Sequence, residues 1–101
     1  MTMKFLIWLS ADCTNLDEIV GALKKKGNEI GVLLVQDGVF LADKGCEHNK
    51  MIVDLKVPLF VSKSHVEERG IDSRLISDVK LVDYSDMVDL MMEKYDRIIS
   101  M

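Results

Sequence analysis

The sequence has little proline, few aromatic residues and no long apolar run. One residue of 101 is proline, 6% are aromatic, and 49% are apolar. No apolar stretch approaches the roughly 20 residues of a membrane-spanning helix, so no membrane association is expected. The opening stretch MTMKFLIWLSADC lacks the long apolar region and the small-residue cleavage site of a signal peptide. These absences predict a single globular domain over residues 1–101, located in the cytoplasm.

An excess of positive charge is also lacking. Thirteen Lys and Arg residues face 17 Asp and Glu residues, for a net charge of −4 and a pI near 5.1. A protein that binds a nucleic-acid backbone without a partner normally carries a stripe of basic residues. The basic cluster Lys24-Lys25-Lys26 suits the C-terminal end of a helix instead. We therefore expect no direct binding to nucleic acid.

Several familiar chemical motifs are missing from the sequence. There is no G-x-G-x-x-G and no G-x-x-x-x-G-K-[ST], so dinucleotide and P-loop phosphate binding have no support. Four potential zinc ligands exist, but no C-x-x-C or H-x(3–5)-H pair; they are Cys13, Cys46, His48 and His65. We expect no cofactor and no metal. An enzyme acting alone on a small molecule is the least favoured interpretation, because no acid–base pair can be named.

Four nearly unbroken apolar runs are present. They extend from Lys4 to Leu9, from Ile30 to Val35, from Val57 to Val61 and from Val79 to Val82. Strands of an antiparallel sheet with one solvent-exposed face would alternate apolar and polar residues. Continuous runs of Val, Leu and Ile are instead typical of parallel strands covered on both faces. The final RIISM stretch could add a short strand.

Helical patterns separate these runs. Leu16, Ile19, Val20 and Leu23 lie on one face of a helix that Gly27 ends. Ser64 to Glu67 matches a capping box that would leave His65 exposed, and Gly70 closes that short helix. A third helix is expected near the C-terminus, with Ser85 as its cap and an apolar face formed by Tyr84, Met87, Val88, Met91 and Tyr95. The order predicts an α/β fold: a three-layer α/β/α domain with a mainly parallel sheet of four to five strands.

Residues 37–56 are expected to connect the second strand to the third. Asp37-Gly38 is expected to turn the chain from a central strand into its crossover, with Asp37 capping a helix-like VFLADKG segment and Gly38 providing backbone freedom. A second helical piece would follow over residues 46–56.

The two cysteines are expected to be free thiols in a reducing compartment. Cys13 follows the first strand and precedes the first helix, at the sheet edge where ligands gather in open α/β folds. A helix N-terminus lowers a thiol pKa, but Asp12 and Asp17 oppose that effect. Cys46 lies within a crossover, where topology gives no reason to expect a site. For each cysteine, a reactive thiol and a semi-buried thiol without function both stay open.

Three short motifs resemble one known family. Leu33 to Val39 matches L-L-x-x-D-G-[VI], Glu68-Arg69-Gly70 is similar to an A-R-G step, and Val82 to Leu90 matches V-D-Y-x-x-[FM]-V-x-L. In this order and spacing, they resemble the DsrH/TusB branch of the DsrE/DsrF/DsrH superfamily. The resemblance covers essentially the whole chain.

The resemblance implies a role in an intracellular sulfur relay, in which persulfide sulfur is handed from one protein cysteine to another. The end use would be 2-thiolation of the tRNA wobble uridine or dissimilatory sulfur oxidation. The implied partners are DsrE-like and DsrF-like subunits, or further copies of the chain, together with sulfur-donor and sulfur-acceptor proteins.

The family's cysteine positions are not matched. By counting back from Gly70, the main relay cysteine falls close to Ser62, and a second family position falls near Val20. Two hypotheses follow. Cys13, or with less support Cys46, carries sulfur in their place, with Asp12, Asp37 and Ser62 along the rim of the site. Alternatively, the chain is a non-catalytic structural or regulatory subunit. A small-ligand binder at the edge formed by Ser10, Asp12, Asp37 and Ser62 is a third option that rests on topology alone.

Overall fold

Five parallel strands form the centre of the molecule. In the computed structural model, the described residues are 3–10, 16–43, 57–76 and 79–100. The strands are β1 (Lys4–Leu9), β2 (Glu29–Leu34), β3 (Leu59–Ser62), β4 (Val79–Val82) and β5 (Arg97–Ser100). They lie in the order β4-β3-β2-β1-β5, and each neighbouring pair is parallel. The predicted parallel sheet and its short final strand are confirmed.

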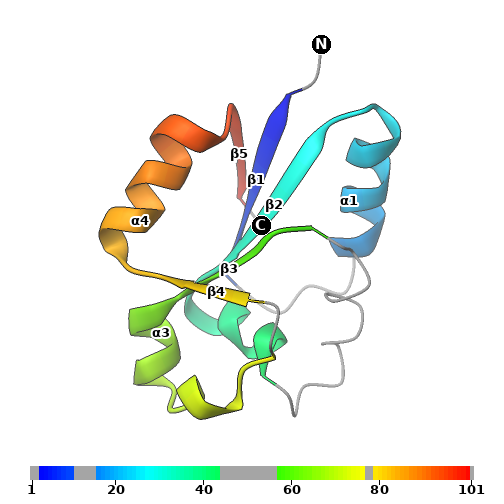
Figure 1. The fold of residues 1–101 in the computed structure, drawn as a ribbon. Coiled ribbons are helices and arrows are strands. Elements are labelled where there is room, and N and C mark those ends of the chain that lie inside the picture. The colour runs from blue at the N-terminus through cyan, green and yellow to red at the C-terminus, as the bar shows by residue number, and fades with distance from the viewer. Residues whose placement is uncertain (1–2, 11–15, 44–56, 77–78, 101) are drawn as a thin grey trace.

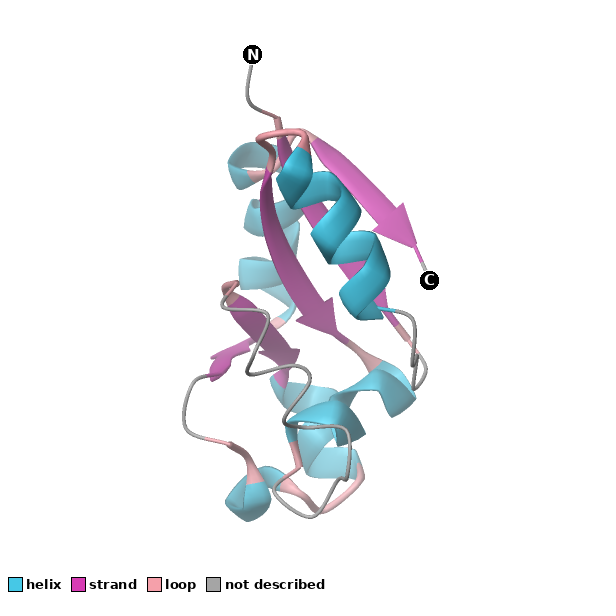
Figure 2. Cartoon of the chain, turned by 90° about the vertical axis from the view of Figure 1, so that its right-hand side faces the viewer, coloured by secondary structure: helices cyan, strands magenta, loops and turns pink. Residues whose placement is uncertain are grey.

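Helices cover both faces of this sheet (Figures 1 and 2). α1 (Leu16–Lys25) lies on one face, and α4 (Tyr84–Asp89), continued by the π-helical segment η3 (Leu90–Lys94), lies on the other. The 3₁₀ helix η1 (Gln36–Ala42), α3 (Lys63–Glu68) and the short 3₁₀ helix η2 (Asp72–Arg74) lie near the carboxyl ends of β2 and β3. The three-layer α/β/α prediction is thereby confirmed.

Successive strand residues supply the two halves of the core. Ile7 and Val32 pack into the cluster on the α1 side, whereas Leu6 and Leu33 pack into the cluster on the α4 side. All four are fully buried. This burial on both faces explains why the apolar runs are continuous rather than alternating.

α1 follows its sequence pattern closely. Val20 is buried in the core, and Ile19 and Leu23 pack against it. Gly27 has a φ of +80°, and its N–H donates to the Lys24 carbonyl at 2.9 Å. Only glycine adopts this conformation at little cost, so the predicted helix end is confirmed.

The predicted caps of the two later helices are wrong. The residue that caps α3 is Ser62, without a side-chain hydrogen bond, and Ser64 lies inside the helix. The reason is that α3 follows β3 with no intervening residue, so the last strand residue becomes the cap. In α4 the cap is Asp83 rather than Ser85, and Asp83 forms a reciprocal capping box with Asp86.

Other boundaries shift by one or two residues. The predicted helix-like piece after β2 begins at Gln36 and is a 3₁₀ helix, whereas the piece expected over residues 46–56 lies outside the described residues. β3 begins at Leu59, two residues after the predicted start. Pro58 precedes it and accepts a hydrogen bond from the Val32 N–H at 2.9 Å. Among the described residues, no helix is long and apolar enough to cross a membrane.

Candidate functional site

The carboxyl ends of β2 and β3 bring two segments of the chain together. Leu34 of β2 pairs with Val61 of β3, so η1 and α3, which follow these strands, meet at one edge of the sheet. Open α/β sheets bind ligands beyond this edge. This edge is therefore the expected position of a functional site.

Ser62 lies at this edge and is fully buried. Its Oγ is 3.4 Å from the Oγ of Ser64, and either hydroxyl can donate. A serine hydroxyl contains no sulfur onto which a persulfide could form. Ser62 therefore offers a hydrogen-bonding group to this edge, but not a sulfur carrier.

His65 connects α3 to the turn after β2 through a hydrogen bond. Its Nδ1 accepts a hydrogen bond from the Gln36 N–H at 3.0 Å, so the neutral ring carries its proton on Nε2. Gln36 has a φ of +48°, a left-handed conformation that costs a non-glycine residue roughly 1–2 kcal/mol. His65 is half-buried rather than exposed, which corrects the expectation for this residue.

Arg69 makes a second link between the same two segments. Its Nε and Nη2 donate to Oδ1 of Asp37 at 3.2 and 3.0 Å, and its Nη1 donates to the His65 carbonyl at 3.4 Å. The guanidinium carbon also lies 6.0 Å from the centroid of the Phe40 ring. The Arg69 side chain is 22% exposed, whereas that of Asp37 is 71% exposed. These contacts give Arg69 a positioning role.

The Asp37–Arg69 pair joins two of the sequence motifs that carry the family resemblance. Asp37 belongs to the LLVQDGV segment and Arg69 to the Glu68-Arg69-Gly70 step. Their positions are 32 residues apart in the chain. The motifs therefore have a shared structural purpose, which is to hold the turn after β2 against α3.

Two details of the predicted turn are wrong. Asp37 does not cap η1, because the capping residue is Val35 and makes no side-chain hydrogen bond. The unusual backbone conformation falls on Gln36 rather than on Gly38, which is buried inside η1. In this conformation the Gln36 N–H donates its hydrogen bond to His65.

The predicted site residues divide into two groups. Asp37 and Ser62 lie at the same carboxyl edge, as the topology requires. Cys13, Cys46 and Asp12 lie outside the described residues, as does His48. Within the described ranges, no group of three or more His, Cys, Asp or Glu residues is arranged to hold a metal ion.

The sequence did not identify the connecting residues of this edge. Gln36, His65 and Arg69 were not predicted as members of a site. The only available signal was the position of Arg69 in a family-like motif. Contacts between residues 29 and 32 positions apart leave no local pattern.

Comparisons with known proteins agree on one family. Residues 10–97 match the family of DsrH-like proteins. The protein TusB of Photorhabdus laumondii is 27% identical over 79 residues, which cover 78% of this chain and 81% of that protein. The protein TusB of Yersinia pestis is 32% identical over 73 residues, which cover 72% of this chain and 77% of that protein.

Solved structures share the fold. A protein of unknown function from Methanobacterium thermoautotrophicum, MTH1491, has a TM-score of 0.78 at 14% identity, with 98% of this chain and 99% of that chain covered. The ychN protein from E. coli also has a TM-score of 0.78, at 16% identity and with both chains fully covered.

The family match spans most of the chain, and the two TusB proteins align with 78% and 72% of it. The chain therefore belongs to the DsrH family, as a DsrH/TusB-like protein with a role in a sulfur-relay system.

Proposed function

We propose that this chain accepts or passes persulfide sulfur between proteins of a cytoplasmic relay, with Cys13 as the carrier and Cys46 as the less favoured candidate. Membership of the DsrH family is the observation that carries the proposal. In sequence, Cys13 lies between the end of β1 at Leu9 and the start of α1 at Leu16. This connection leaves the carboxyl end of β1, the same sheet edge at which Asp37 and Ser62 lie.

The transfer step needs no external oxidant. The thiolate of Cys13 attacks the outer sulfur of a donor protein's persulfide, which forms a new sulfur–sulfur bond. The donor's sulfur–sulfur bond breaks, and the donor cysteine leaves as a thiolate. A second transfer of the same kind passes the sulfur from Cys13 to an acceptor thiol. The persulfide sulfur keeps its oxidation state throughout.

Persulfide loading tests this proposal directly. The chain would be incubated with a protein sulfur donor and its mass measured without reducing agent, alongside Cys13→Ser and Cys46→Ser variants. We expect the wild type and Cys46→Ser to gain one sulfur atom and Cys13→Ser to gain none. If neither thiol gains sulfur, the chain is not a carrier.

A non-catalytic subunit is the second candidate, and two observations favour it. The place of the family's relay cysteine falls close to Ser62, which is fully buried, and the second family position falls near Val20, which is 1% exposed within the core. In this interpretation, the chain shapes a complex with DsrE-like and DsrF-like subunits, or with copies of itself, and carries no sulfur. Replacing both cysteines together would then leave the activity of the assembled complex unchanged.

The proposal extends to the end use of the sulfur, which is thiolation of the tRNA wobble uridine or sulfur oxidation. An acidic chain suits a relay between proteins better than direct tRNA binding, so we favour delivery through a partner. Loss of 2-thiouridine from tRNA in a strain lacking this chain would support wobble-uridine thiolation. Unchanged thiouridine with impaired sulfur oxidation would support the oxidative pathway.

A further inference from the structure

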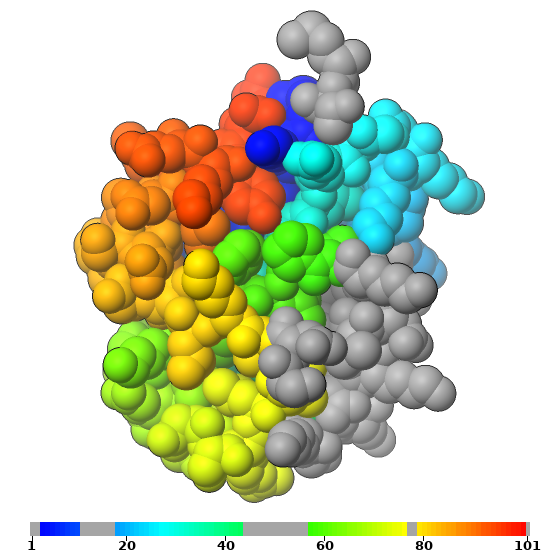
Figure 3. All heavy atoms as spheres, in the orientation of Figure 1, coloured from blue at the N-terminus to red at the C-terminus, as the bar shows by residue number. Residues whose placement is uncertain are grey.

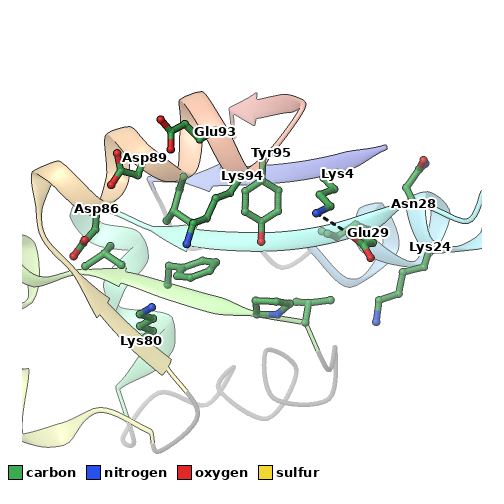
Figure 4. A pocket seen from close by; sticks show the side chains of 16 residues that line it. Lys4, Lys24, Asn28, Glu29, Lys80, Asp86, Asp89, Glu93, Lys94 and Tyr95 are labelled. Carbon is green, nitrogen blue, oxygen red and sulfur yellow. Dashed lines mark ion pairs between the residues drawn. The ribbon is translucent and has the colours of Figure 1, made fainter. Parts of the chain in front are cut away.

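Among the described residues, an open groove lies on the α4 side of the sheet. It has a volume of about 810 Å³ and lies between β3 and β4 on one side and the segment from Asp86 to Tyr95 on the other. Figure 3 shows this face of the molecule, with the C-terminal helical segment in orange and red beside β3 in green. Because its charges balance, the groove favours neither an acidic nor a basic partner. Four lysines and four carboxylates line it, as Figure 4 shows: Lys4, Lys24, Lys80 and Lys94, and Glu29, Asp86, Asp89 and Glu93.

A different feature lies at the carboxyl edge of the sheet, where Gln36 has a left-handed backbone. Its φ is +48°, and among the described residues it is the one non-glycine residue with a positive φ. The two glycines with a positive φ, Gly27 and Gly70, follow α1 and α3, and this conformation is common after helices. Gln36 instead lies just beyond the end of β2. A strained residue persists only where its surroundings hold it, and such residues cluster at functional sites.

Three main-chain N–H groups fix the turn around Gln36. The Val35 N–H donates to the Leu9 carbonyl at 3.0 Å, and the Gly38 N–H donates to the Val35 carbonyl at 2.9 Å. The Gln36 N–H donates to Nδ1 of His65 at 3.0 Å. Of the three acceptors, only Nδ1 belongs to a side chain. His65 is therefore the residue at which a substitution can release this turn.

The contact with His65 is separate from the neighbouring ion pair. Arg69 binds the side chain of Asp37 through Nε and Nη2, whereas His65 binds the main chain of Gln36. Both contacts connect η1 to α3, but only the His65 contact opposes relaxation of the left-handed residue itself. A substitution at His65 therefore tests the conformation of Gln36 more directly than one at Arg69 does.

This turn borders the start of the connection that contains Cys13 in sequence. Because the Val35 N–H bonds to the Leu9 carbonyl, the chain leaves β2 through Gln36 beside the point where it leaves β1 at Ser10. On its other side, β2 pairs with β3. The conformation of Gln36 therefore shapes the part of the carboxyl edge that lies between the ends of β1 and β3.

We propose that His65 is a positioning residue for sulfur transfer. Its unprotonated Nδ1 holds Gln36 in the left-handed conformation, and the resulting turn fixes the edge against which the donor protein presents its persulfide. The inference rests on the proposed function and deepens it by adding a residue that touches no sulfur. The role requires a hydrogen-bond acceptor at this atom rather than an acid, a base or an aromatic ring.

Two substitutions separate the acceptor of His65 from its ring. His65→Asn keeps an acceptor, because its Oδ1 is bonded to Cγ as Nδ1 is, but it loses the ring. His65→Phe keeps a ring of similar size and loses the acceptor. A positioning role through the acceptor predicts that the Asn variant retains transfer and the Phe variant loses it. A role in packing alone predicts the opposite order.

The first readout is the main-chain amide of Gln36, followed by hydrogen exchange in NMR spectra. With its hydrogen bond lost in His65→Phe, this amide should exchange about fivefold to tenfold faster than in the wild type. In His65→Asn it should exchange within about threefold of the wild-type rate. Wild-type spectra should also show a scalar coupling across the hydrogen bond, between the Gln36 amide nitrogen and Nδ1.

The second readout is the rate at which the chain gains one sulfur atom from a persulfide-loaded donor protein, followed by mass. His65→Phe should slow this gain about tenfold, because a displaced edge loses the alignment of the two reacting sulfurs, and His65→Asn should stay within about twofold of the wild type. Gln36→Gly should remove the requirement for His65, since glycine adopts the left-handed conformation without support. The double variant Gln36→Gly/His65→Phe should therefore gain sulfur at close to the wild-type rate.

Glu67→Ala is the matched control, because Glu67 is an exposed residue of the same helix. It should leave both readouts within about twofold of the wild type, as substitutions of exposed residues usually do. Thermal unfolding establishes that each variant is folded. If His65→Phe is not folded, His65→Leu, which also lacks an acceptor, takes its place.

Three results would overturn the inference. They are sulfur gain by His65→Phe at the wild-type rate, equal losses in His65→Asn and His65→Phe, and no recovery in the double variant. Each of them requires a wild type that gains sulfur, so each leaves the carrier proposal standing. If the wild type gains no sulfur, the carrier proposal fails and the positioning role fails with it.

Discussion

Arg69 has more structural contacts than its partner Asp37. It donates to the Asp37 carboxylate and to the His65 carbonyl, and it lies over the Phe40 ring. Asp37 is largely exposed, so solvent weakens the attraction between its carboxylate and Arg69. The two residues therefore contribute unequally to the site edge.

Substitutions at this pair should show that inequality. Arg69→Ala should lower the free energy of unfolding by about 1–2 kcal/mol through lost packing and hydrogen bonds. Asp37→Ala should lower it by less than about 1 kcal/mol. Chemical denaturation of both single variants and the double variant measures the coupling, which we expect to be below about 1 kcal/mol. Equal effects of the two single substitutions would contradict this assignment.

Gly31 is required by the position of Tyr95. Gly31→Ala should destabilise the chain by roughly 1–3 kcal/mol, because the new methyl group would overlap the tyrosine ring. The same change in a Tyr95→Ala background should cost much less, because the overlap is gone. Urea unfolding of the four chains measures the difference. A cost that is equal in both backgrounds would place the strain elsewhere.

The hydroxyl of Tyr95 should lose its proton at a higher pH than an ordinary tyrosine. Burial raises the pKa of its hydroxyl, and the nearby Glu29 carboxylate raises it further. In a Tyr84→Phe background, which leaves one tyrosine, ultraviolet titration should give a midpoint above the usual value of about 10. Glu29→Gln should move the midpoint part of the way back. A midpoint at or below the usual value would contradict the described position of the ring.

The same shift affects stability. Since the folded chain holds the Tyr95 proton more tightly than the unfolded chain does, the resulting stabilisation is fully present below pH 10 or so. It is lost as pH rises through the folded-state pKa.

At the scale of elements, the two candidate residues for capping the start of α4 are Asp83 and Ser85. Asp83 accepts a hydrogen bond from the Asp86 N–H at 2.8 Å, whereas the sequence pattern had favoured Ser85. Asp83→Ala should cost about 1 kcal/mol of unfolding free energy, and Ser85→Ala should cost close to nothing. Thermal denaturation of the two variants checks this, and a larger loss for Ser85→Ala would mean that α4 begins later.

The strands could be predicted because their signal is local. β1 and β4 begin and end where their apolar runs do. In β1 the run is continuous because Leu6 and Ile7 are buried in the cores on opposite faces of the sheet, whereas β4 is an edge strand in which Lys80 and Leu81 are exposed. The C-terminal helix was predicted less well. Tyr84 is 78% exposed although it was expected on the apolar face. The π-helical segment after Asp89 changes the residues per turn, so a strict α-helical period cannot describe this stretch.

The candidate site was harder to predict than the fold. Ser62 and Asp37 could be placed at one edge because parallel strands end together. The links from Gln36 to His65 and from Asp37 to Arg69 could not be predicted, because they depend on how η1 and α3 pack in three dimensions.

At the scale of the whole molecule, the parallel strands end together at one edge of the sheet, and the segments that follow β2 and β3 meet there. Asp37 and Ser62 lie at this edge. The carrier proposal for Cys13, which follows β1 in sequence, concerns the same edge.

Sulfur transfer in the assembled relay tests the central claim most directly. A DsrE-like partner loaded with labelled persulfide would be mixed with the wild type, Cys13→Ser, Cys46→Ser or the double variant, and labelled sulfur on the final acceptor would be measured. We predict that Cys13→Ser and the double variant lose transfer, while Cys46→Ser retains it. Full transfer by the double variant would contradict the carrier role and leave the chain as a structural subunit.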